Sequence, residues 1–176
     1  DADQVAVAVG RFEEEAGGPP ELVVSAAGAF SIQGVHELTP VELHRNLSVN
    51  LEGSVLFARA VLPTMRKARR GLLIQVGSVA GRRPLLGNAA YAASKYGLRG
   101  FHEVLRLELT GSGVRVTLLE PAATDTPLWD SVDPDSDDEL PGRARMLRPE
   151  EVADAVLFVA ERPEGVQISH LAIERV

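Results

Sequence analysis

The sequence contains no cysteine, and only 5% of its 176 residues are aromatic. Without cysteine the chain cannot form disulfides, use a thiolate nucleophile or build a zinc site from thiolates, and its composition is compatible with the cytoplasm. No apolar run approaches the roughly 18 residues that a membrane helix needs. We therefore expect a cytoplasmic protein with no membrane partner.

Positive charge is also scarce, because 18 Lys and Arg residues stand against 25 Asp and Glu residues, for a formal net charge of −7. Only Lys67 and Lys95 are lysines. An acidic balance lacks the basic surface that nucleic acids require, so we expect no nucleic-acid partner. The four histidines show no metal-ligand spacing, and no metal site is expected. The length and the 45% apolar content fit one globular domain.

Short apolar runs alternate with longer helical patterns along the chain. Strand-length runs rich in Val, Ile and Leu occupy Leu22–Ala26, Leu72–Val76, Val114–Leu119 and Gln167–Ile173. Helical periodicity covers Gln4–Glu15, Pro40–Ala68, Asn88–Thr110 and Arg148–Glu161. This alternation predicts an α/β fold with a parallel sheet and crossover helices. Pro63 is expected to kink or divide the second helical stretch.

The segment Asp130–Gly142 is the least regular part of the sequence. It holds six acidic residues together with Pro134 and Pro141. This composition is typical of a solvated surface loop, and a mobile lid beside a pocket is the alternative interpretation.

Tyr91 and Lys95 form the most informative pair, because a spacing of four residues on a helix places both side chains on one face. A tyrosine hydroxyl titrates near pH ~10, and a nearby ammonium favours the phenolate and lowers this pKa. The pair is therefore a candidate general acid/base for a carbonyl or alcohol oxygen. Ser78 follows the strand Leu72–Val76 at the carboxyl edge of the sheet, where its hydroxyl could hydrogen-bond the same oxygen.

With these residues the chain resembles the short-chain dehydrogenase/reductase family, whose catalytic serine and Y-x-x-x-K motif are matched by Ser78, Tyr91 and Lys95. Further family motifs are matched, in the family's order, by Ser25–Gly28, Val49–Gly53 (with Asn50), Pro121–Thr126 and Leu147–Ala153. The resemblance implies a Rossmann-type doubly wound parallel sheet. Of this sheet the chain would hold the C-terminal part, with about four strands and four main helices.

The resemblance also implies an NAD(P)-dependent oxidoreductase that interconverts a ketone or aldehyde and an alcohol, with NAD or NADP as cofactor. Tyr91 would transfer the proton, Lys95 would lower the pKa of the tyrosine and hold the ribose, Ser78 would polarise the substrate oxygen, and Asn50 would hold a water. The family's pairing of helices implies a homodimer or homotetramer. The implied cofactor contacts are Ser25, Ala26, Ala27, Gly28, Tyr91, Lys95, Pro121, Ala122, Thr124 and Thr126.

The family's glycine-rich turn T-G-x-x-x-G-x-G, which holds the cofactor pyrophosphate, has no counterpart in this sequence. We therefore expect residues 1–176 to form a single domain, the C-terminal portion of the fold, without its N-terminal β-α-β-α-β portion and with poor dinucleotide binding. Ser25 stands where the family has asparagine, and Ala122 where it has glycine. Both departures predict an altered cofactor affinity.

Two alternatives to this function remain open. The chain could be a non-catalytic relative or an assembly module unable to bind cofactor. It could also be a serine hydrolase in which Ser78 acts with a histidine, although Gly77–Gly81 does not match the G-x-S-x-G motif. Turnover of a ketone with NADPH or NADH tests the first alternative, and fluorophosphonate labelling of Ser78 tests the second.

Overall fold

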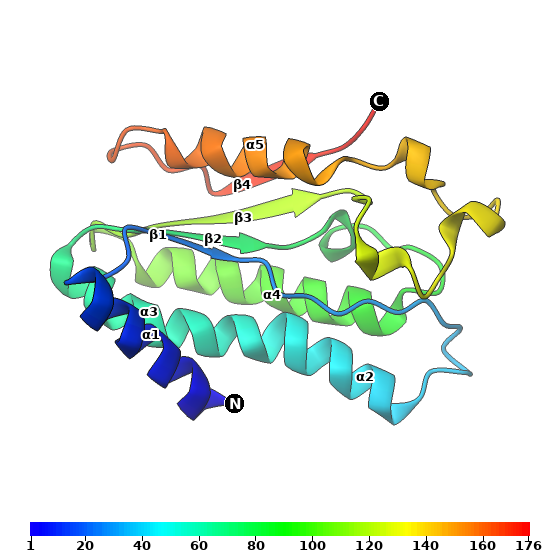
Figure 1. Cartoon of the computed structure of the whole chain (residues 1–176), viewed down its shortest axis with the longest axis horizontal. Coiled ribbons are helices and arrows are strands. Elements are labelled where there is room, and N and C mark those ends of the chain that lie inside the picture. The colour runs from blue at the N-terminus through cyan, green and yellow to red at the C-terminus, as the bar shows by residue number, and fades with distance from the viewer.

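The sheet has four parallel strands, in the order β1-β2-β3-β4 (Figure 1). The computed structural model describes all residues, 1–176. The alternation of apolar runs and helical patterns thus predicted the fold class correctly, and an α/β fold with a parallel sheet is confirmed. The strands are β1 (Leu22–Ser25), β2 (Leu72–Val76), β3 (Arg115–Pro121) and β4 (His170–Ile173).

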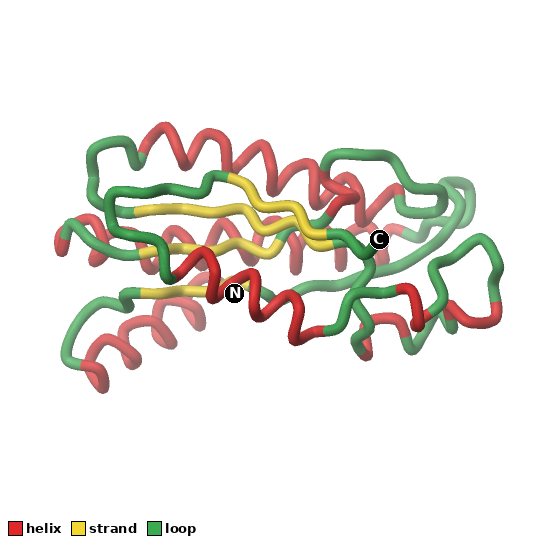
Figure 2. The backbone as a smooth tube through the Cα atoms, turned by 90° about the horizontal axis from the view of Figure 1, so that it is seen from above, coloured by secondary structure: helices red, strands yellow, loops and turns green.

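Helices cover both faces of the sheet. In Figure 1, α5 lies on one side of the strands, and α1, α3 and α4 lie on the other; Figure 2 shows the four strands side by side from above. None of the helices is long and apolar enough to span a bilayer. The helices are α1 (Ala2–Ala16), α2 (Pro40–Leu47), α3 (Gly53–Ala68), α4 (Ala89–Glu108) and α5 (Pro149–Ala160).

The core is divided by the sheet into two apolar clusters. Leu73 of β2 packs into the cluster under α1, α3 and α4, whereas its neighbours Leu72 and Ile74 pack into the cluster under α5. Successive side chains of a strand point to opposite faces, so a strand covered on both faces needs apolar residues at every position. This explains why the apolar runs in the sequence do not alternate with polar residues.

Local capping groups fix where the helices begin. The Asp1 carboxylate accepts hydrogen bonds from the backbone N–H groups of Asp3 and Gln4 at the start of α1. Thr39 caps α2, and Pro40 occupies its first position, where no backbone donor is needed. The helix α2 therefore begins at Pro40 as predicted, whereas α1 begins at Ala2, two residues before the predicted Gln4.

The helical stretch Pro40–Ala68 is divided, but not at Pro63. A π-helical turn at Ser48–Glu52 separates α2 from α3, and α3 continues through Pro63. The prediction that Pro63 divides the stretch is therefore wrong. A π turn accommodates an extra residue in the helix, and Asn50, buried at the centre of this turn, hydrogen-bonds outside the helix.

Short 3-10 turns, rather than a featureless loop, occupy the segment around Asp130–Gly142. The Arg143 guanidinium holds the two ends of this segment together, with Nη1 2.6 Å from Asp125 Oδ1 and Nη2 2.7 Å from Asp130 Oδ1. The backbone N–H of Arg143 also donates to Asp135 Oδ1 at 2.8 Å. Part of the segment lines the cleft described next, so it lies where a lid would lie.

Candidate active site

A cleft of about 770 Å³ opens where β2 and β3 end side by side, at Val76 and Pro121. Its walls come from the segments that follow these two strands, from the first turns of α4 and from residues 126–149. Carboxyl ends of parallel strands are where open α/β sheets bind their ligands. The cleft therefore lies at the edge of the sheet that was predicted for Ser78.

Ser78, Tyr91 and Lys95 all line this cleft. Ser78 is 9% exposed and caps the 3-10 turn that follows β2, its Oγ accepting the backbone N–H of Ala80 at 3.1 Å. Tyr91 and Lys95 lie one turn apart on α4, with Lys95 Nζ 5.6 Å from the centroid of the Tyr91 ring. The structure thus brings the three predicted side chains into one cavity.

Gly81 allows the turn after Ser78 to pack directly against α4. A Cβ atom on this residue would lie 2.9 Å from the carbonyl oxygen of Lys95, which is closer than a real Cβ approaches another atom. Because the contact is backbone to backbone, it fixes the distance between the Ser78 turn and the Tyr91–Lys95 turn.

Burial perturbs both ionisable groups of the pair. It lowers the pKa of the Lys95 ammonium, whose Nζ donates to the Val76 carbonyl at 2.9 Å, to about 8. It also raises the pKa of the Tyr91 phenol above its ordinary value, and hydrogen bonding with the Ser78 side chain offsets part of the rise. The pKa of Tyr91 is therefore raised overall, with burial as the largest cause.

Asn50 is buried behind the cleft and does not line it. Its Oδ1 accepts the backbone N–H of Ala29 at 2.8 Å, and its Nδ2 donates to the Ala29 carbonyl and to Ser94 Oγ, both at 2.9 Å. Both N–H groups of the side-chain amide and its oxygen thus join the segment after β1 to α4. In this arrangement Asn50 orients two walls of the site.

The segments predicted to contact the cofactor lie around the cleft, although not all of their residues face it. Ser25 and Ala27 do not line the cleft. Thr124 donates its hydroxyl to the Ala122 carbonyl at 3.0 Å, which leaves its oxygen free to accept a further hydrogen bond. The predicted cofactor residues that do line it are Ala26, Gly28, Tyr91, Lys95, Pro121, Ala122, Thr124 and Thr126.

An aromatic corner beside Tyr91 was not predicted from the sequence. The Phe30 ring packs edge-on against Tyr91 with centroids 5.0 Å apart, and Trp129 packs on Phe30 at 4.7 Å. Both rings line the cleft. The available signal was compositional, since the only tryptophan of an aromatic-poor chain falls in the irregular stretch after β3.

No histidine lines the cleft, which disfavours the serine hydrolase alternative. The buried His102 uses its ring nitrogens on the Ser169 carbonyl and the Gln75 amide, and His170 pairs with Glu103. Ser78 therefore has no imidazole base within hydrogen-bonding distance.

A sequence model described as short chain dehydrogenase matches residues 1–137. The chain belongs to the short-chain dehydrogenase family. The NADP-dependent 3-hydroxy acid dehydrogenase YdfG of Salmonella typhi is 35% identical over 152 residues, which are 84% of this chain and 61% of that protein. The chain thus spans less than two thirds of this curated relative.

Solved structures of short-chain dehydrogenases share the fold. Serine dehydrogenase from Escherichia coli superimposes with a TM-score of 0.73 and 32% identity, over 87% of this chain and 62% of that one. Alcohol dehydrogenase from Thermococcus sibiricus, complexed with 5-hydroxy-NADP, gives a TM-score of 0.87 and 25% identity, over 100% of this chain and 71% of that one. The predicted Rossmann-type parallel sheet is thereby confirmed.

Proposed function

We propose that this chain carries the proton-transfer site of an NAD(P)-dependent oxidoreductase that interconverts a ketone or aldehyde with an alcohol. The observation that carries the proposal is the placement of Ser78, Tyr91 and Lys95 around one cleft at the ends of β2 and β3. The similarity to proteins named as an NADP-dependent 3-hydroxy acid dehydrogenase and an alcohol dehydrogenase supports this reaction class. The proposed cofactor is NAD or NADP.

The cleft residues fit the nicotinamide and ribose end of such a cofactor. Lys95 offers an ammonium, and Thr124 and Thr126 offer hydroxyls, all lining the same cleft. Ala26 and Gly28 also line the cleft and have no bulky side chains. When bound, the cofactor supplies a hydride to the substrate carbon or removes one from it.

Tyr91 is the proposed proton donor when a ketone is reduced. Its raised pKa keeps the phenol protonated at neutral pH, so it meets the substrate as an acid. Ser78 accepts one backbone N–H and hydrogen-bonds with Tyr91, and its O–H would turn to the substrate oxygen when substrate binds between the two side chains. The proton passes from the phenol to this oxygen as hydride reaches the neighbouring carbon, and the alcohol forms.

Lys95 is proposed to bind ribose hydroxyls while it stays attached to β2. Its Nζ has three donors, of which one is used on the Val76 carbonyl. The remaining donors are close to the Tyr91 ring, where a positive charge stabilises the phenolate left after proton transfer. The same side chain would therefore affect both cofactor binding and turnover.

The substitution Tyr91→Phe tests the proposal, with Tyr96→Phe on the exposed face of the same helix as a matched control. Ketone reduction with NADPH should fall about 10²- to 10⁴-fold in the first variant only, because one hydroxyl is lost from the cleft. Circular dichroism should show both variants folded. Wild-type rates in Tyr91→Phe would contradict the proton-donor role, and a wild-type chain that neither binds NADPH nor turns over would favour the non-catalytic alternative.

We also propose that the protein forms a homodimer or homotetramer through its outer helix faces. Val104 and Leu107 of α4 are 55% and 65% exposed, and Leu157 and Phe158 of α5 are about half exposed. Apolar side chains grouped on a helix face favour association. Light scattering of the purified protein checks this, and a monomer at all concentrations would contradict it.

A further inference from the structure

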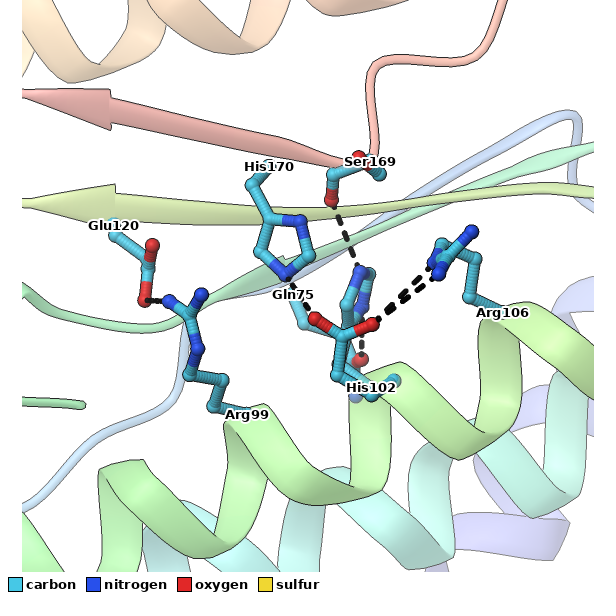
Figure 3. Close-up of polar contacts among 8 residues, drawn as sticks. Gln75, Arg99, His102, Arg106, Glu120, Ser169 and His170 are labelled. Carbon is cyan, nitrogen blue, oxygen red and sulfur yellow. Dashed lines mark hydrogen bonds and ion pairs between the residues drawn. The ribbon is translucent and has the colours of Figure 1, made fainter. Parts of the chain in front are cut away.

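An ion pair between the partly exposed Arg99 and the buried Glu120 connects α4 to the end of β3, outside the groups assigned above. Arg99 Nη1 lies 2.7 Å from Glu120 Oε1, and Figure 3 shows the Arg99 side chain extending from α4 toward Glu120. Glu120 is only 2% exposed, and Arg99 is its only ionic partner. Removing a carboxylate from water is costly, and apolar residues would fill such a position at lower cost. The pair therefore calls for an explanation beyond packing.

Glu120 lies at the junction of the two strand ends that form the cleft. It directly precedes Pro121, where the proposed cofactor segment begins. Its Cγ also lies 3.4 Å from the position that a Cβ on Gly77 would take, and Gly77 directly precedes Ser78. The Glu120 side chain thus lies beside the residue that precedes Ser78, while its backbone leads directly into the proposed cofactor segment.

Arg99 lies one helical turn beyond Lys95, so the same face of α4 carries Tyr91, Lys95 and Arg99 in succession. Lys95 holds the helix to β2 through the Val76 carbonyl, and Arg99 holds it to β3 through Glu120. Two attachments to adjacent strands fix both the height and the rotation of the helix above the sheet.

We propose that Arg99 and Glu120 are a positioning pair that sets the Tyr91–Lys95 turn relative to Ser78 and the segment after Pro121. Neither side chain needs to touch substrate or cofactor. The inference rests on the proposed function of Tyr91 and Lys95. Its consequence is that loss of the pair changes the geometry of proton transfer while the core remains packed.

The test compares Glu120→Gln, Arg99→Met, the double variant and Arg99→Lys, which keeps the positive charge. The exposed pair Arg11–Glu15 on α1, with a similar 2.9 Å separation, provides the matched control Glu15→Gln. Cofactor dissociation constants, kcat and KM are measured for each variant. Amide hydrogen exchange is followed without cofactor in three peptides, one at 77–81, one at 122–126 and one in the α3 core at 57–65.

Glu120→Gln and Arg99→Met should each lower kcat on the order of 100-fold, as expected when catalytic groups are misplaced by about 1 Å. The double variant should be no worse than either single one, Arg99→Lys should recover part of the loss, and Glu15→Gln should match the wild type. Exchange should quicken in the two cleft peptides and stay unchanged in the α3 core.

Additive losses of kcat would overturn the inference, because they indicate that the two side chains act independently. Exchange that quickens equally in all three peptides would also overturn it, because it indicates a general loss of stability. If the proposed function is wrong, the wild-type chain shows no turnover. Hydrogen exchange without cofactor then still tests whether the Arg99–Glu120 pair holds the two cleft peptides in place. Unchanged exchange in both cleft peptides would overturn the inference whatever the activity.

Discussion

Acid should destabilise this protein through His102, a fully buried side chain on the face of α4 that packs against the sheet (Figure 3). Burial is the largest cause that lowers its pKa from about 6.5 to about 4. His170 and Arg106 lower it further, whereas the Ser169 carbonyl and Glu103 act in the opposite direction. The neutral ring donates one hydrogen bond, and Nε2 lies 3.0 Å from the Ser169 carbonyl oxygen.

The sign of the effect follows from proton binding in the two states. The unfolded chain binds a proton at His102 below about pH 6.5, whereas the folded chain binds one only near pH 4. The contribution of neutral His102 to the free energy of unfolding is therefore complete above about pH 6.5 and is lost as the pH falls toward 4. For these two pKa values the loss is about 2 kcal/mol at pH 5 and about 3 kcal/mol near pH 4.

Urea unfolding at about pH 7.5 and about pH 5 measures this loss. The variant His102→Gln should lose about 2 kcal/mol less between the two pH values than the wild type does. His36→Gln is the control for the loss of a surface histidine, because the His36 side chain is 85% exposed. A His102→Gln variant with the full wild-type loss, or a His102 NMR resonance that titrates near pH 6.5, would refute the reasoning.

Three further predictions concern the cleft. Lys95→Met should weaken cofactor binding as well as turnover, because Lys95 lines the cleft beside Tyr91 and is proposed to bind the ribose; an unchanged dissociation constant in a fluorescence titration would contradict the ribose contact. Gly81→Ala should lower the free energy of unfolding measured in urea by about 1–3 kcal/mol, since its Cβ would lie 2.9 Å from the Lys95 carbonyl oxygen; Gly10→Ala, with open space around it, is the control. Arg143→Met should raise the substrate KM and quicken proteolysis of residues 127–142, because the guanidinium holds Asp125 and Asp130; wild-type proteolysis would show that the segment is held by other contacts.

Much of the fold could be predicted because hydrophobic periodicity is a local property of the chain. β2 has the bounds that were predicted, and α2 begins at Pro40 as expected. The position at which the second helical stretch divides could not be predicted. It arises where Asn50 hydrogen-bonds to Ala29, a residue 21 positions away in the sequence.

The candidate site was predictable as a set of residues but not as an electrostatic environment. The spacing of Tyr91 and Lys95 placed them on one face, and the strand end placed Ser78 at the same edge. The pKa of Tyr91 depends on how deeply the surrounding segments bury it, and no local pattern gives that depth. The aromatic corner was missed for the same reason, because Phe30 and Trp129 are distant in the sequence.

The carboxamide of Asn50 gives the two halves of the cleft a common support. It contacts Ala29, which follows the Gly28 wall, and Ser94, which directly precedes Lys95. A displacement of one wall is thereby transmitted to the other through a single side chain. We therefore expect substitutions of Asn50 to change the substrate affinity and the turnover number together.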